Sequence, residues 1–346
     1  MLADAEVVVV GAGIMGLAAA RELRRQGRDV VVLEQFRLGH ARGSSHGATR
    51  IFRLAYPEKE WVTLAREALA GWRDLEAEGG TEIVSLVGFV ELVRDLADSS
   101  ERALASCGVA CQVLQAAEAE ARFALAVPDG FTALLQPDAG IVYAERAHAA
   151  FRAGLTVRED VRVLRLEPKA GGVHLETTAG PLAAGAVVVT AGAWARPLLA
   201  TSGIELPVEP TRETVAYFAL PARGLPAVAE FAPGERRHAF YALFDPKHGL
   251  KAGLNGSGGP VDPNDEGEPD PEVVRRVAGW VAERFPSVDA RPARDETCLY
   301  TNTRDERFVL ERRGRVVVGS ACSGHGFKFA PVVGHRLAAL AADALA

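Results

Sequence analysis

The stretch Gly11-Ala12-Gly13-Ile14-Met15-Gly16 carries the strongest structural signal in this chain. It follows the β-branched run 6–10, which is typical of a strand buried on both faces of a parallel sheet. It precedes residues 17–26, whose composition is helical. In such a G-x-G-x-x-G turn the first glycine permits a tight bend, the second lets backbone approach a pyrophosphate, and the third lets the helix pack closely on the strand. The helix N-terminus also offers free N–H groups and a positive dipole end to phosphates. The stretch therefore predicts a dinucleotide-binding turn.

An acidic residue lies where such a turn needs one. Gly27 is placed to end the helix, residues 30–33 read as the next strand, and Glu34 follows 18 residues after Gly16. A carboxylate at the end of this second strand can accept hydrogen bonds from the ribose hydroxyls, and it disfavours a 2′-phosphate. The turn and the acid together still leave FAD and NAD as alternatives.

Outward from this unit, the hydrophobic pattern predicts further helices and strands. We expect helices over 58–78, 271–285 and from 332 to the C-terminus, and strands over 83–93, 182–190, 214–220, 239–244 and 316–319. The predicted fold class is α/β (α+β overall): a Rossmann-like dinucleotide-binding domain with an interleaved, mostly antiparallel β-sheet domain for the substrate. We assign 1–82, 132–206 and 296–346 to the first domain, and 83–131 and 207–295 to the second.

Composition excludes several kinds of partner. The 346 residues carry a net charge of −6, which argues against a nucleic-acid or anionic-membrane partner. No apolar run approaches the length of a membrane span, and the N-terminus, with Asp4 and Glu6, reads as a strand and not as a signal peptide. Four scattered cysteines without metal-ligand spacing predict reduced thiols in a cytoplasmic protein and no metal site.

Three later segments indicate the chemistry. They are Gly43-Ser44-Ser45-His46-Gly47-Ala48-Thr49-Arg50-Ile51-Phe52-Arg53, Cys298-Leu299-Tyr300-Thr301 and Ser323-Gly324-His325-Gly326-Phe327-Lys328-Phe329. With Gln136-Pro137-Asp138-Ala139-Gly140, Ala191-Gly192-Ala193-Trp194 and Gly249-Leu250-Lys251, they make the chain resemble, over nearly its full length, the monomeric sarcosine oxidase and N-methyltryptophan oxidase family of D-amino-acid-oxidase-like flavoproteins.

The resemblance implies FAD as the cofactor. Cys298 matches the cysteine that forms a thioether with the flavin 8α carbon, although a buried, inert thiol is the common alternative. We read Cys322 as packing. The cofactor-binding residues that the resemblance and the turn imply are Gly11, Gly13, Ile14, Met15, Gly16, Glu34, Ser44, Ser45, Thr49, Arg50, Gly192, Trp194, Cys298, Gly324, Gly326, Phe327 and Lys328.

The resemblance also implies a site for an amino-acid substrate. Arg53 and Lys328 match the pair that holds the substrate carboxylate, by a bidentate fork and a point charge, and the alternative is two solvated surface cations. Tyr241 and Tyr300 match tyrosines on the amine side, where ordinary core packing is the alternative. Gly324 matches a residue whose carbonyl faces the substrate nitrogen.

Three further residues are implied next to the flavin ring. Lys251 matches the lysine near flavin N5 that promotes the reaction with oxygen, since a fixed positive charge stabilises developing superoxide. The alternative is an exposed strand lysine. Arg50 matches a residue that stabilises negative charge on the reduced ring. His46 matches a residue next to the ring, and the alternative is a histidine that only forms hydrogen bonds with backbone groups of its Gly/Ser loop.

The reaction implied is oxidation of a secondary or N-methyl amino acid by hydride transfer to flavin, giving an imine, and hydrogen peroxide from oxygen. Asn255 stands where the sarcosine enzymes have a histidine, so the substrate stays open. The alternatives are a cyclic imino acid such as pipecolate or proline, a larger N-methyl amino acid, a dehydrogenase with another electron acceptor, or a non-catalytic flavin-binding subunit. The family suggests a monomer.

Overall fold

A mixed sheet of eight strands forms one end of the molecule. The computed structural model describes residues 4–94, 100–220, 224–231 and 238–346. In this first sheet the order β10-β11-β12-β1-β2-β9 is extended by β19, which pairs with β12, and by β18. The strands are β1 (Ala5–Val10), β2 (Val30–Leu33), β9 (Thr156–Arg158), β10 (Val163–Lys169), β11 (Gly172–Thr177), β12 (Gly180–Val189), β18 (Val309–Arg313) and β19 (Val316–Ser320).

The central strands of this sheet are buried on both faces. Val7 and Val9 of β1 join the core under the helices, whereas Val8 and Val10 join a second core toward β10 and β11. Pairing of β1 with β2, β12 with β1 and β12 with β19 is parallel. The unbroken valine run of the sequence therefore reflects burial on both sides, as expected for a parallel sheet.

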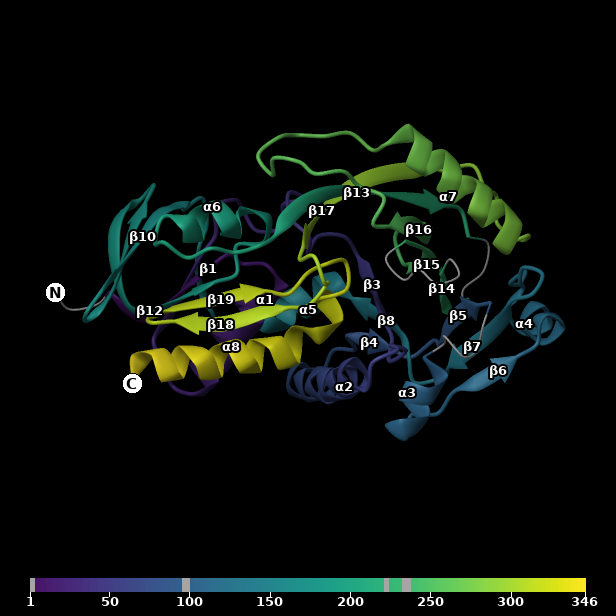
Figure 1. The fold of residues 1–346 in the computed structure, drawn as a ribbon, viewed down its shortest axis with the longest axis horizontal. Helices are drawn as coiled ribbons and strands as arrows, with labels where there is room; N and C mark the ends of the chain where they lie inside the picture. The colour runs from purple at the N-terminus through teal and green to yellow at the C-terminus, as the bar shows by residue number, and fades with distance from the viewer. Residues whose placement is uncertain (1–3, 95–99, 221–223, 232–237) are drawn as a thin grey trace.

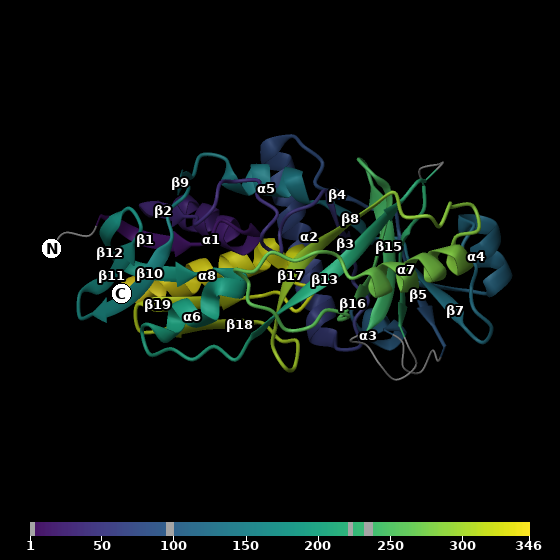
Figure 2. The ribbon, with the colours of Figure 1, turned by 90° about the horizontal axis from the view of Figure 1, so that it is seen from above.

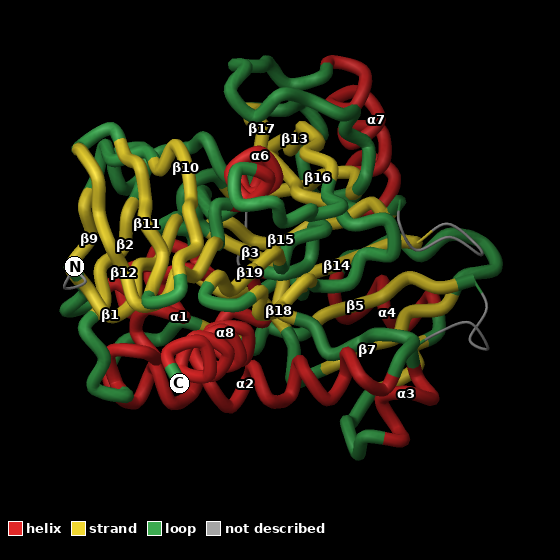
Figure 3. The backbone as a smooth tube through the Cα atoms, turned by 60° about the vertical axis from the view of Figure 1, so that its left-hand side comes forward, coloured by secondary structure: helices red, strands yellow, loops and turns green. Residues whose placement is uncertain are grey.

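Helices cover one side of the first sheet. Figure 3 shows α1, α2 and α8 gathered beneath it, and the two termini lie at the same end of the molecule (Figure 1). Gly334 of α8 lies so close to α1 that an added Cβ would be 2.7 Å from Ala18 Cβ, so glycine allows this helix pair to touch. The helices are α1 (Ile14–Arg25), α2 (Lys59–Gly79), α3 (Glu101–Ser106), α4 (Ala116–Phe123), α5 (Ala144–Arg152), α6 (Ala195–Ala200), α7 (Pro271–Arg284) and α8 (Ala330–Leu345), with short 3₁₀ turns at Gly192–Trp194 and Phe327–Phe329.

A second eight-stranded sheet forms the other end, with α7 above it (Figures 1 and 2). Its order is β17-β13-β16-β15-β14-β5-β7-β6, and every pairing except β14 with β5 is antiparallel. Its strands are β5 (Phe89–Val93), β6 (Gln112–Leu114), β7 (Thr132–Gln136), β13 (Glu209–Phe218), β14 (Ala227–Phe231), β15 (Ala239–Asp245), β16 (Gly249–Asn255) and β17 (Arg294–Asn302).

The two faces of this sheet differ in character. Ala216 and Phe218 of β13 pack with Leu250 and Ala252 of β16 in the core that includes α7. Because side chains alternate along a strand, their neighbours Tyr217 and Lys251 lie on the opposite face. That face carries Lys251, Tyr241, Cys298 and Tyr300, which line the cavity described in the next subsection.

One predicted strand was wrong. Residues 83–93 form two strands, because Gly88 takes a left-handed φ of 89° and donates its N–H to Ala139 O. The first part, β4 (Val84–Ser85), pairs with β8 (Gly140–Tyr143) in a small sheet that also contains β3 (Thr49–Phe52). The second part is β5 of the second sheet.

The predicted fold class is confirmed: a parallel-centred sheet with helices and a mostly antiparallel sheet share the chain. The predicted division into domains stays a prediction. Strands β7 and β17 both belong to the second sheet. Strand β7 begins at the predicted domain border at 132, and β17 crosses the predicted border at 296. No helix in the described part of the chain is long and apolar enough to cross a membrane.

Candidate active site

The glycine turn has the geometry that its sequence predicts. Gly11 has a φ of 99°, and a Cβ there would lie 2.7 Å from Thr190 O. A Cβ on Gly16 would lie 2.0 Å from Gly11 O, so only glycine lets α1 pack on the turn. Gly13 is different, because its nearest neighbour would be Ser45 Oγ at 3.5 Å. Gly13 therefore presents open backbone to a ligand.

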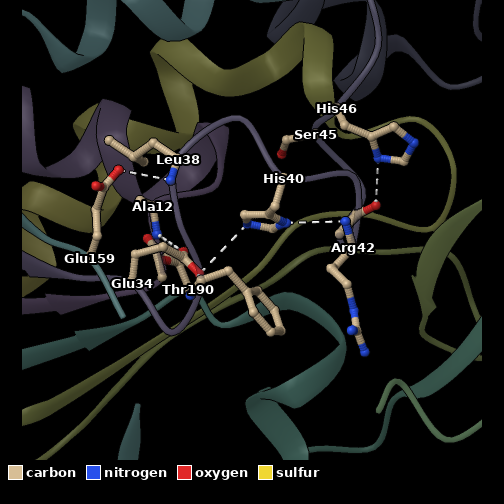
Figure 4. Close-up of polar contacts among 12 residues, drawn as sticks. Ala12, Glu34, Leu38, His40, Arg42, Ser45, His46, Glu159 and Thr190 are labelled. Atoms are coloured by element: carbon tan, nitrogen blue, oxygen red, sulfur yellow. Dashed lines mark hydrogen bonds and ion pairs between the residues drawn. The ribbon is translucent and has the colours of Figure 1, made fainter. Parts of the chain in front are cut away.

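Glu34 organises the space beside this turn (Figure 4). Its carboxylate is buried, and it accepts hydrogen bonds from Ala12 N at 2.8 Å and Phe36 N at 3.0 Å. His40 Nε2 lies 3.6 Å from Glu34 Oε1, and burial lowers the pKa of His40 although Glu34 opposes this. The sequence analysis missed His40, which the Gly/Ser/His loop 39–49 brings to the acid.

The same loop ties the turn to the second sheet. Ser45 Oγ accepts a hydrogen bond from Ile14 N at 3.2 Å, at the start of α1. The Ser44 hydroxyl donates to Leu299 O of β17. His46 lies between Gly43 O and Thr297 O, which are 3.0 and 3.1 Å from its two ring nitrogens. The loop thus holds the nucleotide turn and β17 in a fixed relation.

One cavity of about 1110 Å³ runs from the glycine turn to the second sheet. Every predicted site residue except Gly16 lines it, which agrees with the packing role of Gly16. The cavity brings together residues that are distant in the chain: Gly11, Gly13, Ile14, Met15, Glu34, Ser44, Ser45, His46, Thr49, Arg50, Arg53, Gly192, Trp194, Tyr241, Lys251, Cys298, Tyr300, Gly324, Gly326, Phe327 and Lys328.

Strand register explains how the second sheet contributes. Cys298 and Tyr300 are two residues apart on β17 and therefore share a face. Tyr241 pairs with Gly253, and Gly253 is two residues after Lys251 on β16. These side chains converge on the cavity from three strands, so the C-x-Y spacing in the sequence is a period-two signal.

Lys251 is a buried cation. Its exposed fraction is 6%, and no acidic oxygen within the described ranges lies within 4.0 Å of its Nζ. Burial, followed by the positive charge of Arg50, lowers the pKa of Lys251 to about 8. Cys298, Glu296 and Asp245 oppose that shift. The ionisation of Lys251 therefore depends on the charges of these neighbouring groups.

Arg50 is held by backbone carbonyls, and no acid in the described part of the chain forms an ion pair with it. It donates to Thr49 O at 2.8 Å and Ser44 O at 2.9 Å, and also to His46 O. Its guanidinium lies 5.4 Å from the centre of the Phe327 ring. Burial, and then Arg50, lower the pKa of His46 to about 4, so His46 is neutral at pH 7 and acts as a link between carbonyls.

Arg53 and Lys328 form a cationic pair that lines the same cavity. Lys328 is 5% exposed and donates from Nζ to His325 O at 2.7 Å and Tyr56 Oη at 3.2 Å. The Arg53 guanidinium lies 4.0 Å from the centre of the Tyr56 ring. Burial, and then Arg53, hold the pKa of Lys328 well below its usual range. Neither cation has an acidic partner among the described residues, so the pair could hold a small anion.

Tyr56 and His325 are functional candidates that the sequence analysis missed. Tyr56 follows Arg53 by three residues, and its hydroxyl contacts both Lys328 and His325 Nδ1, the latter at 3.3 Å. His325 also reaches Glu306 O through Nε2 at 3.1 Å. The position of His325 inside Ser323–Phe329 was the available signal, whereas nothing in the sequence marked Tyr56.

Tyr241 on β15 and Tyr300 on β17 line the same cavity as Lys251. Burial raises the pKa of both phenols, so they are neutral hydroxyls. Gly324 has a φ of 73°, and a Cβ there would lie 2.5 Å from the Tyr300 ring and 2.7 Å from Asn255 Oδ1. The backbone of Gly324 therefore approaches the tyrosine and the asparagine as closely as backbone can.

Cys298 is a protonated thiol in this arrangement, because burial raises its pKa to about 11. Lys251 and Arg50 act in the opposite direction and favour the thiolate. Cys322 has different surroundings: its Sγ lies 3.4 Å from Thr301 N and 3.8 Å from Ser44 Oγ. These contacts fit the packing role expected for Cys322.

Known proteins resemble this chain over almost its whole length. The family described as FAD dependent oxidoreductase matches residues 6–340. The chain belongs to this family. Peroxisomal sarcosine oxidase of Mus musculus is 33% identical over 96% of the chain and 90% of its own length. Monomeric sarcosine oxidase of Bacillus sp. (strain B-0618) is 31% identical, covering 97% of the chain and 92% of its own length.

A solved structure agrees with this FAD-dependent oxidoreductase in fold. NikD, an amino acid oxidase essential for nikkomycin biosynthesis, superimposes with a TM-score of 0.87 at 28% identity, over 97% of this chain and 93% of NikD. The family resemblance inferred from the motifs is thereby confirmed.

The cavity of this FAD-dependent oxidoreductase fits its cofactor. Gly13 leaves backbone open beside α1, whose first turn contains no acidic residue to repel a pyrophosphate. Glu34 is buried beside the turn, where its carboxylate could accept hydrogen bonds from ribose hydroxyls. The opposite end, with Arg50, Lys251 and Cys298, is where a flavin ring would lie if the turn holds the ADP half. Among the described residues no group of His, Cys, Asp or Glu could hold a metal ion.

Proposed function

We propose that this FAD-dependent oxidoreductase is an oxidase of secondary amino acids, with an N-methyl amino acid such as sarcosine as substrate and oxygen as electron acceptor. The observation that carries the proposal is the cationic pair Arg53 and Lys328, which shares one cavity with the glycine turn and has no acidic partner among the described residues. The names of the sarcosine oxidase relatives support the same substrate class.

The residues of the chain would prepare the substrate in two ways. The Arg53 guanidinium can bind the substrate carboxylate through two hydrogen bonds, and Lys328 adds a point charge. The carboxylate would then be the counter-ion of both cations. The rings of Tyr241 and Tyr300 remove water from the amine, and Arg50 and Lys251 add positive charge nearby. Both effects favour the neutral amine, which is the form whose carbon can release a hydride.

Bound FAD supplies the two-electron chemistry: it takes a hydride from the carbon next to nitrogen and passes two electrons to oxygen. The amine loses a proton as well, so the products are an imine and, with two protons, hydrogen peroxide. The role proposed for Lys251 is to keep a positive charge where oxygen is reduced. Arg50 would act on negative charge in the reduced ring, and His46 would hold the loop that carries Arg50.

We also propose that the flavin is attached covalently through Cys298. The thiol lies on the cavity face of β17, and Lys251 and Arg50 favour its ionised form, which is the nucleophile that a thioether requires. The 8α carbon would lose a proton, the flavin itself would take up the two electrons released as the C–S bond forms, and oxygen would reoxidise it. A monomeric state and a cytoplasmic location belong to the proposal too, and size-exclusion chromatography with light scattering tests the first of them.

Anaerobic titration of the purified yellow protein tests the substrate class. Sarcosine and other N-methyl amino acids should bleach the flavin, and admission of air should restore it with one hydrogen peroxide per substrate. An N-methylalkylamine without a carboxylate should react at least about 100-fold more weakly, because the anion site stays empty. Bleaching by pipecolate or proline alone would assign a cyclic imino acid instead. Absence of bleaching by any of these compounds would overturn the proposal.

A further inference from the structure

Glu296 is a half-buried acid that none of the predicted roles uses. It precedes Cys298 by two residues on β17, so the two side chains share the cavity face of the second sheet. Strand β13 connects this acid to Lys251: Val215 pairs with Glu296, and Tyr217 pairs with Lys251. Glu296 and Lys251 therefore lie on one face, separated by a single strand.

Contacts fix the carboxylate in place. The Tyr217 hydroxyl donates to Glu296 Oε1, and Arg294 lies 3.1 Å from Oε2. The Glu296 side chain is 18% exposed, whereas Arg294 is 52% exposed, so the acid points inward and its arginine points to solvent. Tyr217 also lies with its ring centre 5.8 Å from Lys251 Nζ. One tyrosine thus donates a hydrogen bond to the acid and presents its ring to the lysine.

Gly47 marks the space that Glu296 and Lys251 share. A Cβ added at Gly47 would lie 3.4 Å from an Arg50 nitrogen, 3.6 Å from Lys251 Nζ and 3.8 Å from Glu296 Oε1. With a φ of 89°, Gly47 leaves this space free of side-chain atoms. Two cations and one acid therefore surround the same small volume.

The charges around Lys251 make this acid important. Arg50 of β3 disfavours the charged form of Lys251. A proton on His46 of the loop would act in the same direction, but more weakly. Three groups favour the charged form of Lys251: Cys298 and Glu296 on β17, and Asp245 on β15. Asp245 accepts hydrogen bonds from Lys247 N and His248 N in the β15–β16 turn, and Cys298 is a neutral thiol.

The ionisation of Glu296 itself agrees with this picture. Burial acts to raise its pKa, but the hydrogen bond from Tyr217 and the charges of Lys251, His46 and Arg294 outweigh burial, and the pKa is lowered. The acid is therefore a carboxylate throughout the pH range in which Lys251 would lose its proton.

We propose that Glu296 is a positioning residue for the oxygen reaction: its carboxylate keeps the buried Lys251 ammonium charged at the pH at which the enzyme works. The inference rests on the proposed function of Lys251, and it does not depend on which amine is oxidised. The protein thereby places an acid close enough to Lys251 to support its charge, but not so close as to cancel it through a direct ion pair.

The test follows the reaction of reduced holoenzyme with oxygen. Dithionite reduces the flavin without any amine, so a wrong substrate assignment leaves this measurement intact. Stopped-flow rates between pH 6 and pH 10 should fall as Lys251 loses its proton, with a wild-type midpoint near the pKa of about 8. The pH midpoint of the change in absorbance of the oxidised flavin gives a second readout that needs no turnover.

Glu296→Gln keeps an acceptor for Tyr217 and removes the charge. We expect both midpoints to move down by about 1 pH unit, so that the oxygen rate at pH 8 falls about fivefold. Glu296→Asp should return the midpoints to within about 0.5 unit of wild type. If the amide variant does not retain flavin, Glu296→Met removes the same charge, and the same shift is expected.

Asp295→Asn is the matched control. Asp295 is the preceding residue on β17, is exposed, and faces the other side of the sheet, so the same loss of charge there should leave both midpoints unchanged. Midpoints that stay within about 0.3 unit of wild type in Glu296→Gln would overturn the proposal, as would an equal shift in Asp295→Asn. Loss of the pH dependence in Lys251→Met identifies Lys251 as the titrating group.

Discussion

The two ends of the cavity differ in how their polar groups are satisfied. At the nucleotide end, Glu34 accepts two backbone N–H groups and Ser45 accepts the N–H of Ile14. At the reactive end, Lys251, Lys328 and Arg53 are cations without an acidic partner within the described part of the chain. The polar side chains at the nucleotide end thus hold backbone groups of the protein in place, whereas the reactive end keeps cations whose counter-ion would have to come from a ligand.

Polar groups at the nucleotide end of the cavity therefore serve mainly the structure, whereas the cations at the reactive end serve mainly the function. Buried cations without counter-ions cost stability, and proteins accept that cost mainly at functional sites. Because the reactive end gains most from a ligand, substrate analogues with a carboxylate should stabilise the protein against unfolding. Changes at the nucleotide end should affect retention of the cofactor, and changes at the reactive end should affect chemistry.

The largest expected effect concerns the link between the two ends. In the wild type, flavin fluorescence should stay with the denatured protein, and in Cys298→Ser it should be released completely, because a hydroxyl at this position does not form the thioether. Acid precipitation followed by fluorescence of the pellet and the supernatant measures this. Cys322→Ser is the matched control and should retain the flavin. Release of flavin from the wild type would show that no covalent bond forms.

The next effect isolates the charge at the reactive end. Lys251→Met should slow reoxidation of the dithionite-reduced enzyme by oxygen by about 10²- to 10³-fold, because a preorganised charge is removed from the site of oxygen reduction. Anaerobic reduction by sarcosine should change by less than about tenfold. Lys251→Arg keeps the charge and should recover most of the oxygen rate. Equal losses in both half-reactions would assign Lys251 to binding and not to oxygen.

The glycine turn offers the corresponding test at the nucleotide end. A Cβ on Gly16 would lie 2.0 Å from Gly11 O, so Gly16→Ala should destabilise the apoprotein by about 3 kcal/mol. Gly13→Ala meets only Ser45 Oγ at 3.5 Å, so it should leave stability within about 0.5 kcal/mol while weakening flavin binding. Denaturant unfolding of the apoproteins and flavin titration measure the two effects separately.

The same contrast explains what the sequence could predict. The nucleotide end is local: strand, turn, helix and acid occur within residues 6–34, and each glycine has a steric reason that the pattern already contains. The cores also follow from period and composition, since Val7 and Val8 face opposite sides of β1. The predicted strand 83–93 was wrong because its interruption depends on the left-handed φ of Gly88 and a distant carbonyl, Ala139 O.

The reactive end depends on register between distant strands. Lys251, Cys298 and Lys328 were found through their motifs, but Tyr56 and Glu296 were not. Nothing in the sequence states that β13 separates β16 from β17, which is what brings Glu296 near Lys251. Likewise, Tyr56 becomes notable only when Lys328, 272 residues away, donates to its hydroxyl.

A smaller effect is expected at the anion site. Lys328→Met should weaken binding of an N-methyl amino acid by about 30-fold, close to 2 kcal/mol, because one charged hydrogen bond to the carboxylate is lost. The concentration dependence of anaerobic flavin reduction measures this affinity. An N-methylalkylamine without a carboxylate serves as the control ligand, and its reaction should be unchanged. A similar loss for both compounds would contradict a carboxylate role for Lys328.

The smallest effect separates the two contacts of Tyr56. Tyr56→Phe keeps the ring under Arg53 and removes the hydroxyl that touches Lys328 and His325, so substrate affinity should fall only about threefold to fivefold. Tyr56→Leu also removes the ring and should cost more, because Arg53 then loses its stacking surface. Ser45→Ala removes one hydrogen-bond acceptor at the nucleotide end and should leave substrate affinity unchanged. If Ser45→Ala weakened substrate binding as much as Tyr56→Phe, the two ends of the cavity would be coupled. The positions of the groups at the reactive end would then depend on the nucleotide turn and not on the contacts of the cations themselves.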